Sequence, residues 1–388
     1  MTYHEDTEIL YRGMEPQCVV GQPEVMPIYP STAYCVRDTA DYTFANRGGK
    51  YLYNRTANPN RDALGAAISG LEDGEKTLLC SSGMAAISTT LLGLLRAGDH
   101  ILVNRAVYGE TIELIQTILS RFQIEASFAD FTDPKAVEAD LQPNTVLLYT
   151  EVITNPLTHV IDLSSMAKIA HNHGALLVVD STFSTPFLIR PLAQGADLVL
   201  HSLTKYFGGH SDLTGGSITG SRSLIEQIQP SQLLLGCCLD PISAWMFSRS
   251  IATMAMRVRR QNENAIALAQ ALQQHPEVRA VYHPSLADHP QHSLATQILS
   301  GGYGAILSFQ VEDDLERVDQ FFHKLKLVRY LGTLGGIRTS VTHPATAFRD
   351  SFSEEELCDM GLTDGLIRIS VGAEDVDDLI ADFRQALE

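Results

Sequence analysis

ALLVVD at residues 175–180 and DLVLHSLTKYFGGH at residues 197–210 decide the fold of this chain. The strands that begin these stretches carry apolar runs with almost no polar alternation, and TVLLYTEV at 145–152 has the same character. Strands of this kind occur in parallel sheets that helices cover on both faces. The sequence therefore predicts an α/β domain built on a parallel sheet.

The pattern of strands and helices continues on both sides of these stretches. Toward the N-terminus we expect strands at TLLC (77–80) and HILVN (100–104), with helices from Asp62 to Gly74, Met84 to Leu95 and Thr111 to Phe122. After residue 245 we expect a long helix over 246–274, strands at AVYHP (280–284), AILSFQV (305–311) and IRISVG (367–372), a helix near 313–325 and a last helix. The second part predicts a smaller α/β domain with an antiparallel sheet.

Composition excludes several classes of partner. The chain has 28 basic and 46 acidic residues, a net charge of −18, which argues against binding to nucleic acid or to an anionic membrane surface. No apolar run reaches the ~18 residues of a membrane span. The acidic start MTYHEDTEIL has no apolar core typical of a signal peptide. Six cysteines without a C-x-x-C pair favour a reduced, cytoplasmic chain.

Polar side chains follow the predicted strands, where open parallel sheets bind ligands. Ser81-Ser82-Gly83-Met84 leads into a helix and can hold a phosphate with free backbone N–H groups, or merely cap the helix. Tyr108 can stack on a planar ring or pack against the core. Asp180 can pair with a protonated ring nitrogen or cap the next segment. Lys205 can form a Schiff base or lie on the surface.

Taken together, these residues favour a cofactor-binding site over the purely structural roles. A phosphate turn, a stacking tyrosine, a strand-end carboxylate and a strand-end lysine fall on one sheet edge, in order. Pyridoxal 5′-phosphate (PLP) needs an anion cradle, a ring clamp, an acidic pyridinium partner and a Schiff-base lysine. We therefore expect PLP as the cofactor. A zinc site at His283, His289 and His292 is not expected, because the spacing is poor and prolines interrupt it.

From about residue 20 to its end the chain resembles the Cys/Met-metabolism family of PLP-dependent enzymes. This family includes cystathionine γ-lyase, methionine γ-lyase and cystathionine γ-synthase. The most specific block is VVDSTFSTP…HSLTKYFGGHSD, and supporting blocks are YNRTANPNR, SSGMAAI, HPQHSLA…GGYGAILSF, LGTLGG, HPAT and IRISVGAED. The resemblance implies PLP fold type I, with an N-terminal arm and inter-subunit loop over 1–60, a PLP-binding domain over 61–245 and a C-terminal domain over 246–388.

The resemblance also implies roles for single residues. Lys205 would bind PLP and move protons, Asp180 would pair with the ring nitrogen, and Tyr108 would stack on the ring. The phosphate would be held by Ser82, Gly83, Met84, Ser202 and Thr204 and, from the neighbouring subunit, by Tyr53 and Arg55. Tyr53 is also implied in activating the leaving group. The substrate side would involve Arg368, which grips the α-carboxylate, together with Asn155 and Thr333.

The activity that the resemblance implies is γ-elimination from an amino acid, with carbon–sulfur bond cleavage, in a homotetramer made of two dimers. A γ-replacement enzyme, such as cystathionine γ-synthase or O-acylhomoserine sulfhydrylase, would use the same residues. A non-catalytic binding protein on the same fold is disfavoured, because Lys205, Asp180 and Arg368 are all present.

At two positions a charged residue departs from the family pattern. Arg338 stands where the family usually has a glutamate after LGG, and Glu110 follows Tyr108-Gly109, where methionine γ-lyases carry a cysteine. The two charges can pair with each other, or hold the distal ammonium and carboxylate of cystathionine. Alternatively, Glu110 can hold a cationic distal group such as the guanidinium of canavanine. These charges argue against plain methionine as the substrate, because a thioether needs none.

Overall fold

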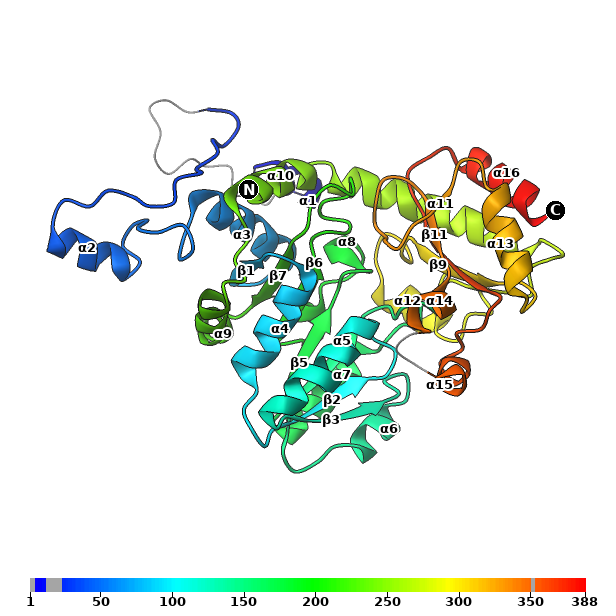
Figure 1. Cartoon of the computed structure of the whole chain (residues 1–388), viewed down its shortest axis with the longest axis horizontal. Helices are drawn as coiled ribbons and strands as arrows, with labels where there is room; N and C mark the ends of the chain where they lie inside the picture. Colours follow the sequence, from blue (N-terminus) through cyan, green and yellow to red (C-terminus); the bar gives the residue numbers. More distant parts are fainter. Residues whose placement is uncertain (1–3, 12–22, 350–352) are drawn as a thin grey trace.

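The computed structural model describes residues 4–11, 23–349 and 353–388. Its larger sheet has seven strands in the order β1-β7-β6-β5-β4-β2-β3 (Figure 1). The strands are β1 Lys76–Cys80, β2 His100–Asn104, β3 Glu125–Ala129, β4 Thr145–Glu151, β5 Leu176–Asp180, β6 Leu198–Ser202 and β7 Gly216–Gly220.

One strand of the larger sheet departs from the parallel arrangement that the sequence predicts. β4, β5 and β6 pair in parallel, as do β2 with β3 and with β4, whereas β7 runs antiparallel to both β1 and β6. The sheet is therefore mixed. β7 (GSITG) and β3 (EASFA) were not predicted, because β7 is short and glycine-rich and β3 is an edge strand that begins with exposed residues.

Helices cover both faces of the larger sheet (Figure 1). Residues of α4, α5 and α9 pack in one apolar core, and residues of α7 pack in the core of the opposite face. The helices of this part are α3 Pro59–Leu71, α4 Gly83–Leu94, α5 Gly109–Glu113, α6 Pro134–Ala139, α7 Leu163–His173, α8 Thr185–Leu188, α9 Arg222–Leu235 and α10 Pro241–Ile251, with short 3₁₀ turns at Leu119–Phe122 and Pro191–Gln194.

Two expected helices are divided. The segment 111–122 starts as α5, continues as one π-helical turn over Leu114–Ile118 and ends as a 3₁₀ turn. The expected helix over 246–274 is split between α10 and α11 Met254–Gln273. The carbonyl of Ser250 accepts hydrogen bonds from the Thr253 backbone N–H and the Arg257 guanidinium, which closes the first helix there. The predicted domain boundary near residue 245 falls inside α10.

The second sheet has five strands in the order β10-β11-β12-β9-β8. It is antiparallel except for the pairing of β10 with β11. Its strands are β8 Ala280–Tyr282, β9 Ile306–Gln310, β10 Arg329–Tyr330, β11 Ser340–Thr342 and β12 Leu366–Ser370. Its helices besides α11 are α12 His292–Ile298, α13 Leu315–Lys324, α14 Pro344–Phe348, α15 Glu354–Asp359 and α16 Val376–Leu387.

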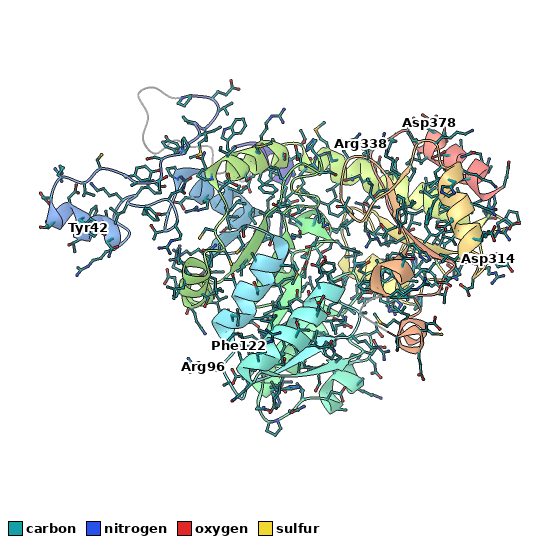
Figure 2. The ribbon with its side chains drawn as sticks, in the orientation of Figure 1. Tyr42, Arg96, Phe122, Asp314, Arg338 and Asp378 are labelled. Carbon is teal, nitrogen blue, oxygen red and sulfur yellow. The ribbon has the colours of Figure 1, made fainter. Side chains whose placement is uncertain are left out.

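The N-terminal segment is only partly separate from the two sheets, because its Ile9 packs in an apolar core with residues of α3 and α10. It carries α1 Glu5–Tyr11 and α2 Thr39–Asn46, and the part around α2 extends away from the body of the molecule (Figure 1). Tyr42 and Phe44 on α2 are more than half exposed, and Figure 2 shows Tyr42 at this extremity. Cys18 lies outside the described residues, and the other five cysteines are free. Within the described ranges, no helix has the length and apolarity needed to span a bilayer.

Candidate active site

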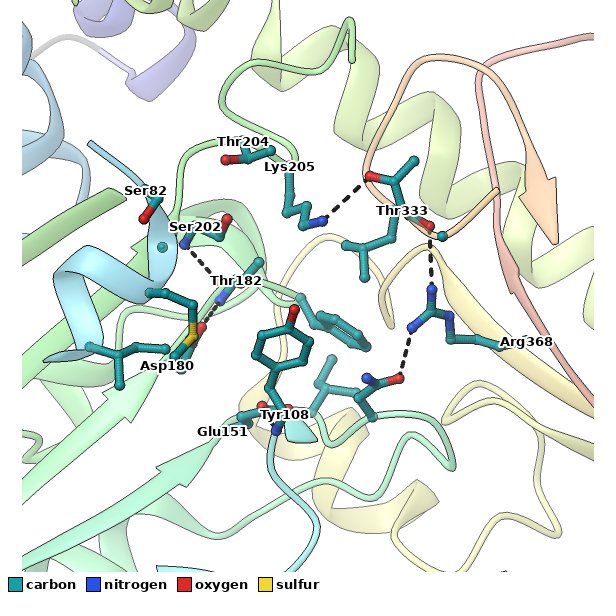
Figure 3. Close-up of a pocket in the computed structure, with 18 residues that line it drawn as sticks. Ser82, Tyr108, Glu151, Asp180, Thr182, Ser202, Thr204, Lys205, Thr333 and Arg368 are labelled. Carbon is teal, nitrogen blue, oxygen red and sulfur yellow. Dashed lines mark hydrogen bonds between the residues drawn. The ribbon is translucent and has the colours of Figure 1, made fainter. Parts of the chain in front are cut away.

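A cavity of about 240 Å³ opens where the carboxyl ends of β1, β4, β5 and β6 meet the loop 332–334 and β12 of the second sheet (Figure 3). Both parts of the chain therefore contribute to it. The lining residues are Ser82, Gly83, Met84, Ile87, Tyr108, Glu151, Ile153, Asn155, Asp180, Thr182, Phe183, Ser202, Thr204, Lys205, Gly332, Thr333, Leu334 and Arg368.

The N-terminus of α4 forms one wall. Ser82 caps the helix, and its Oγ accepts a hydrogen bond from the Ala85 backbone N–H at 3.0 Å. A Cβ atom on Gly83 would lie 2.8 Å from the Cβ of Ser202, so glycine keeps this wall open. Thr204 Oγ1 binds the backbone of Gly215 from the next loop. A free helix N-terminus flanked by hydroxyl groups is a ready anion site.

Lys205 follows β6, and its ammonium group lies 3.4 Å from the hydroxyl of Thr333. Burial, together with the positive charge of Arg368, lowers the pKa of Lys205, and Glu110 opposes this effect. A lysine with a lowered pKa has its free amine more often, which makes it both a nucleophile and a proton acceptor.

Arg368 enters the cavity from β12. Its Nη1 donates to Asn155 Oδ1 at 3.0 Å, and its Nη2 donates to Thr333 O and Thr342 Oγ1, both at 3.3 Å. Its Nε is buried and has no partner among the described residues. Burial lowers the pKa of Arg368 to about 10. A buried guanidinium with a spare donor suits a carboxylate ligand.

Tyr108 lies between these groups. In Figure 3 its ring stands in the middle of the cavity, between Asp180 and Arg368. Burial raises the pKa of Tyr108, and a hydrogen bond to Glu110 raises it further. The Tyr108 phenol therefore stays protonated at neutral pH. Glu110 is itself exposed, beside the cavity rather than in its lining.

Three predicted site residues lie elsewhere in the chain. Arg338 is exposed on the outer surface (Figure 2), does not line the cavity, and has no ion pair with Glu110 among the described residues. Tyr53 is 43% exposed, and Arg55 donates to the carbonyl of Leu233, also away from the cavity. The reading in which Glu110 and Arg338 pair therefore finds no support in the geometry of one chain.

The cavity also contains residues that the sequence analysis missed. Glu151 ends β4 beside Asp180, and its Oε1 accepts the Tyr108 backbone N–H at 2.7 Å. Thr182 donates its backbone N–H to Asp180 Oδ1 at 2.8 Å, and its Oγ1 accepts from the Ser202 N–H. Glu151 had the same signal as Asp180, a carboxylate at the end of an apolar strand, and could have been found by it.

These groups fit PLP. The α4 N-terminus with Ser202 and Thr204 can hold a phosphate, Tyr108 can cover a planar ring, and Asp180 can face a protonated ring nitrogen. Lys205 lies within the same cavity for the covalent link. The buried Nε of Arg368, which has no partner among the described residues, can bind an anionic group. Fold and cavity together define a PLP-dependent enzyme.

The comparisons with known proteins agree. Residues 6–388 match the model of the family described as Cys/Met metabolism PLP-dependent enzyme. The chain is 42% identical over 364 residues to cystathionine gamma-lyase from Bacillus subtilis, covering 94% of each chain. It is 38% identical to L-methionine gamma-lyase from Pseudomonas putida, covering 98% of this chain and 96% of that one.

A solved structure is also similar to this chain over its whole length. Cystathionine gamma synthase from Xanthomonas oryzae pv. oryzae, in complex with aminoacrylate and cysteine, has a TM-score of 0.94 and 34% identity, covering 100% of this chain and 98% of that one. The chain therefore belongs to the Cys/Met metabolism family of PLP-dependent enzymes, with fold type I and PLP as cofactor.

Proposed function

We propose that the chain catalyses PLP-dependent γ-elimination from an amino acid with a leaving group on Cγ, as a carbon–sulfur lyase of the cystathionine and methionine γ-lyase type. The observation that carries the proposal is the connection between Lys205 and Arg368 in one cavity. Thr333 contacts both, through its hydroxyl to Lys205 and its carbonyl to Arg368. An α-carboxylate on Arg368 would therefore place its Cα–H bond near the lysine amine.

Each cavity residue would have a separate role in the reaction. When bound, PLP supplies an electron sink for the carbon next to the substrate amine. Arg368 holds and orients the α-carboxylate. Lys205, with its lowered pKa, accepts the α-proton. Tyr108 keeps its phenolic proton and can donate it to the leaving group.

A second candidate is γ-replacement, in which a thiol adds where the leaving group departs. The similarity to a cystathionine gamma synthase over the whole chain favours it. The same residues would bind substrate and move protons. The difference lies in which nucleophile, water or a thiol, the cavity admits.

A third candidate is γ-elimination from a substrate with a cationic distal group, such as canavanine. Glu110 supports it, because this carboxylate hydrogen-bonds Tyr108 and is close enough to affect the pKa of Lys205. Since Arg338 does not line the cavity, Glu110 presents a negative charge that this arginine does not neutralise.

A panel of amino acids distinguishes the three. Cystathionine, methionine, homocysteine, canavanine and O-acetylhomoserine are each assayed for ammonia, 2-oxobutanoate and homoserine, with and without an added thiol. Oxo-acid release from a sulfur-containing substrate without thiol supports the C–S lyase. A thiol-dependent product with little oxo acid supports replacement, and turnover restricted to canavanine supports the third candidate.

We also propose a homotetramer in which Tyr53 and Arg55 reach the phosphate of a neighbouring chain. Its support is their exposure and their distance from the cavity of their own chain.

A further inference from the structure

Two carboxylates lie side by side at the end of the central strands. Glu151 and Asp180 are direct partners in the parallel register of β4 and β5, and each is the last residue of its strand. Neighbouring strands lie about 4.8 Å apart, and side chains at partnered positions share a face of the sheet. Both side chains line the cavity, so both face the ligand that it holds.

The two carboxylates have different hydrogen bonds. Asp180 Oδ1 accepts from the Thr182 backbone N–H at 2.8 Å. Glu151 Oε1 accepts from the Tyr108 backbone N–H at 2.7 Å, while its Oε2 is buried and has no partner among the described residues. A buried carboxylate oxygen without a donor is costly if charged, but it is well placed to carry a proton.

The lysine and the arginine of the cavity bond to other groups and not to this pair. Among the described residues neither carboxylate forms a salt bridge, and the cations of the cavity, Lys205 and Arg368, bond to Thr333 and Asn155 instead. The other titratable groups facing the pair are Tyr108, Tyr149 and His201.

Burial and like charge then decide which carboxyl is neutral. Burial raises the pKa of both, and the charge of Asp180 raises that of Glu151 further. Hydrogen bonds from Thr182 and the charge of His201 pull the pKa of Asp180 back down, whereas backbone hydrogen bonds from Tyr108 and Asn155 leave the pKa of Glu151 well above its usual value. Two adjacent carboxylates, of which Glu151 is buried and Asp180 half-buried, cannot both ionise cheaply, and this favours a proton on Glu151.

We propose that Glu151 is a positioning residue that stays protonated beside Asp180, anchoring the Tyr108 main chain and leaving Asp180 as the single anion that faces the ring nitrogen of PLP. A protonated ring nitrogen brings one positive charge and balances one carboxylate, not two. The proposal rests on the family's cofactor and not on the type of elimination, so it stands or fails independently of the substrate.

The first test measures the affinity of the apoproteins for PLP by absorbance titration. Glu151→Gln keeps the Tyr108 acceptor and imitates the neutral acid, so it should bind PLP within about threefold of wild type. Asp180→Asn loses a charged hydrogen bond and should bind about tenfold or more weakly. Glu138→Gln, at an exposed position on α6, is the matched control. Equal losses of PLP affinity in Glu151→Gln and Asp180→Asn would overturn the proposal.

The second test removes the acceptor while keeping the side chain neutral. Glu151→Met should bind PLP about tenfold more weakly than Glu151→Gln, because the Tyr108 N–H loses its partner. If Met and Gln bind alike, Glu151 does not position Tyr108. If both variants fail to fold by circular dichroism, a neutral group does not suffice at this position and the proposal is wrong.

A third test needs no PLP. A carboxyl whose pKa is raised by folding stabilises the protein fully below its unfolded pKa, about 4.3, and loses that contribution as pH rises through the folded value. The thermal midpoint of the wild-type apoprotein should therefore fall, as pH rises above 5, relative to that of Glu151→Gln. Glu138→Gln should follow wild type. Parallel curves for wild type and Glu151→Gln would contradict a proton on Glu151.

Discussion

The proposed role of Lys205 as nucleophile and proton acceptor can be tested by one substitution. Among the described residues its amine hydrogen-bonds to the Thr333 hydroxyl, and burial lowers its pKa. We expect Lys205→Ala to reduce oxo-acid release at least about a thousandfold, because the nucleophile and proton acceptor are lost together. The yellow colour expected of the wild type should also become removable by dialysis.

The control for Lys205 is Lys168→Ala, at an exposed position on α7. It should match wild type in both activity and colour retention. An active Lys205→Ala variant, or a wild type that is colourless and active, would refute the assignment.

Glu110 is the second residue whose role can be measured. If it holds a cationic distal group, Glu110→Ala should lower kcat/KM for a cationic substrate about tenfold to a hundredfold more than for a neutral analogue, because a charged hydrogen bond is lost. Glu113→Ala, exposed at the end of the same short helix, is the matched control. Equal losses on both substrates would mean that Glu110 acts only through Tyr108.

The site residues that could be predicted from the sequence are those that follow the end of an apolar strand. Asp180 and Lys205 each follow an apolar strand, and the parallel order of those strands brings them to one edge. Glu151 was missed because it was taken as part of the strand that it ends. Arg338 was expected near the substrate from its place in a family block. A single exposed loop residue gives no sequence signal for the direction in which its side chain points.

At the scale of elements, the Asp382 side chain on α16 binds the loop after α13. Asp382 is buried and accepts the backbone N–H groups of 326–328 at 2.9, 3.0 and 3.0 Å. We expect Asp382→Ala to lower the free energy of unfolding by about 2–4 kcal/mol, because three backbone N–H donors, the one of Val328 buried, lose a charged acceptor. Asp378→Ala, on the exposed face of the same helix (Figure 2), should cost no more than about 1 kcal/mol.

Denaturant unfolding monitored by circular dichroism would measure both variants. Comparable losses for Asp378→Ala and Asp382→Ala would show that the contacts of Asp382 do not hold this helix.

The turn after β8 should respond to acid. His283 is buried, bonds Ser285 Oγ at 2.7 Å and the Gly304 carbonyl at 3.2 Å, and burial lowers its pKa to about 4. A histidine whose folded pKa lies below its unfolded value of about 6.5 stabilises the fold above 6.5, and this contribution is lost as pH falls toward 4. The thermal midpoint should therefore fall between these values.

The variant for this prediction is His283→Asn, which cannot take up the proton and should flatten the fall. The exposed His323→Asn on α13 should leave the wild-type curve unchanged. An unaltered slope for His283→Asn would place the acid sensitivity elsewhere.

Helices and strands could be predicted where a single sequence pattern, such as a continuous apolar run, was strong. Continuous apolar runs marked β2, β4, β5 and β6, which are buried over most of their length. The division at Ala252 was not predictable, because apolar periodicity continues across it and the break depends on tertiary bonds to the Ser250 carbonyl. β7 was missed because it is short and has a glycine at each end, although its Ile218 is buried in the core.

At the scale of the whole molecule, the proposed sharing of sites between chains is testable by mixing variants. Lys205→Ala chains lack the lysine, and Arg55→Ala chains lack the arm residue. If Arg55 serves a neighbour, co-refolded mixtures should regain part of the wild-type activity that neither variant has alone. Light scattering should give about four times the 42.5 kDa of one chain.

The control for this experiment is the mixture of Lys205→Ala with Arg368→Ala. Both residues line the cavity of their own chain, so no assembly can restore a complete site. Recovery in that control, or a monomeric mass in solution, would argue against shared sites.

The contact of Thr333 with both Lys205 and Arg368 has a consequence for redesign. A substitution at Thr333, or a shift of the short loop 332–334, changes the lysine's hydrogen bond and the arginine's carbonyl partner at the same time. Engineers who wish to alter substrate choice without slowing proton transfer therefore have more freedom on the Tyr108 side of the cavity. The loop from the second sheet is the part of the pocket least open to independent adjustment.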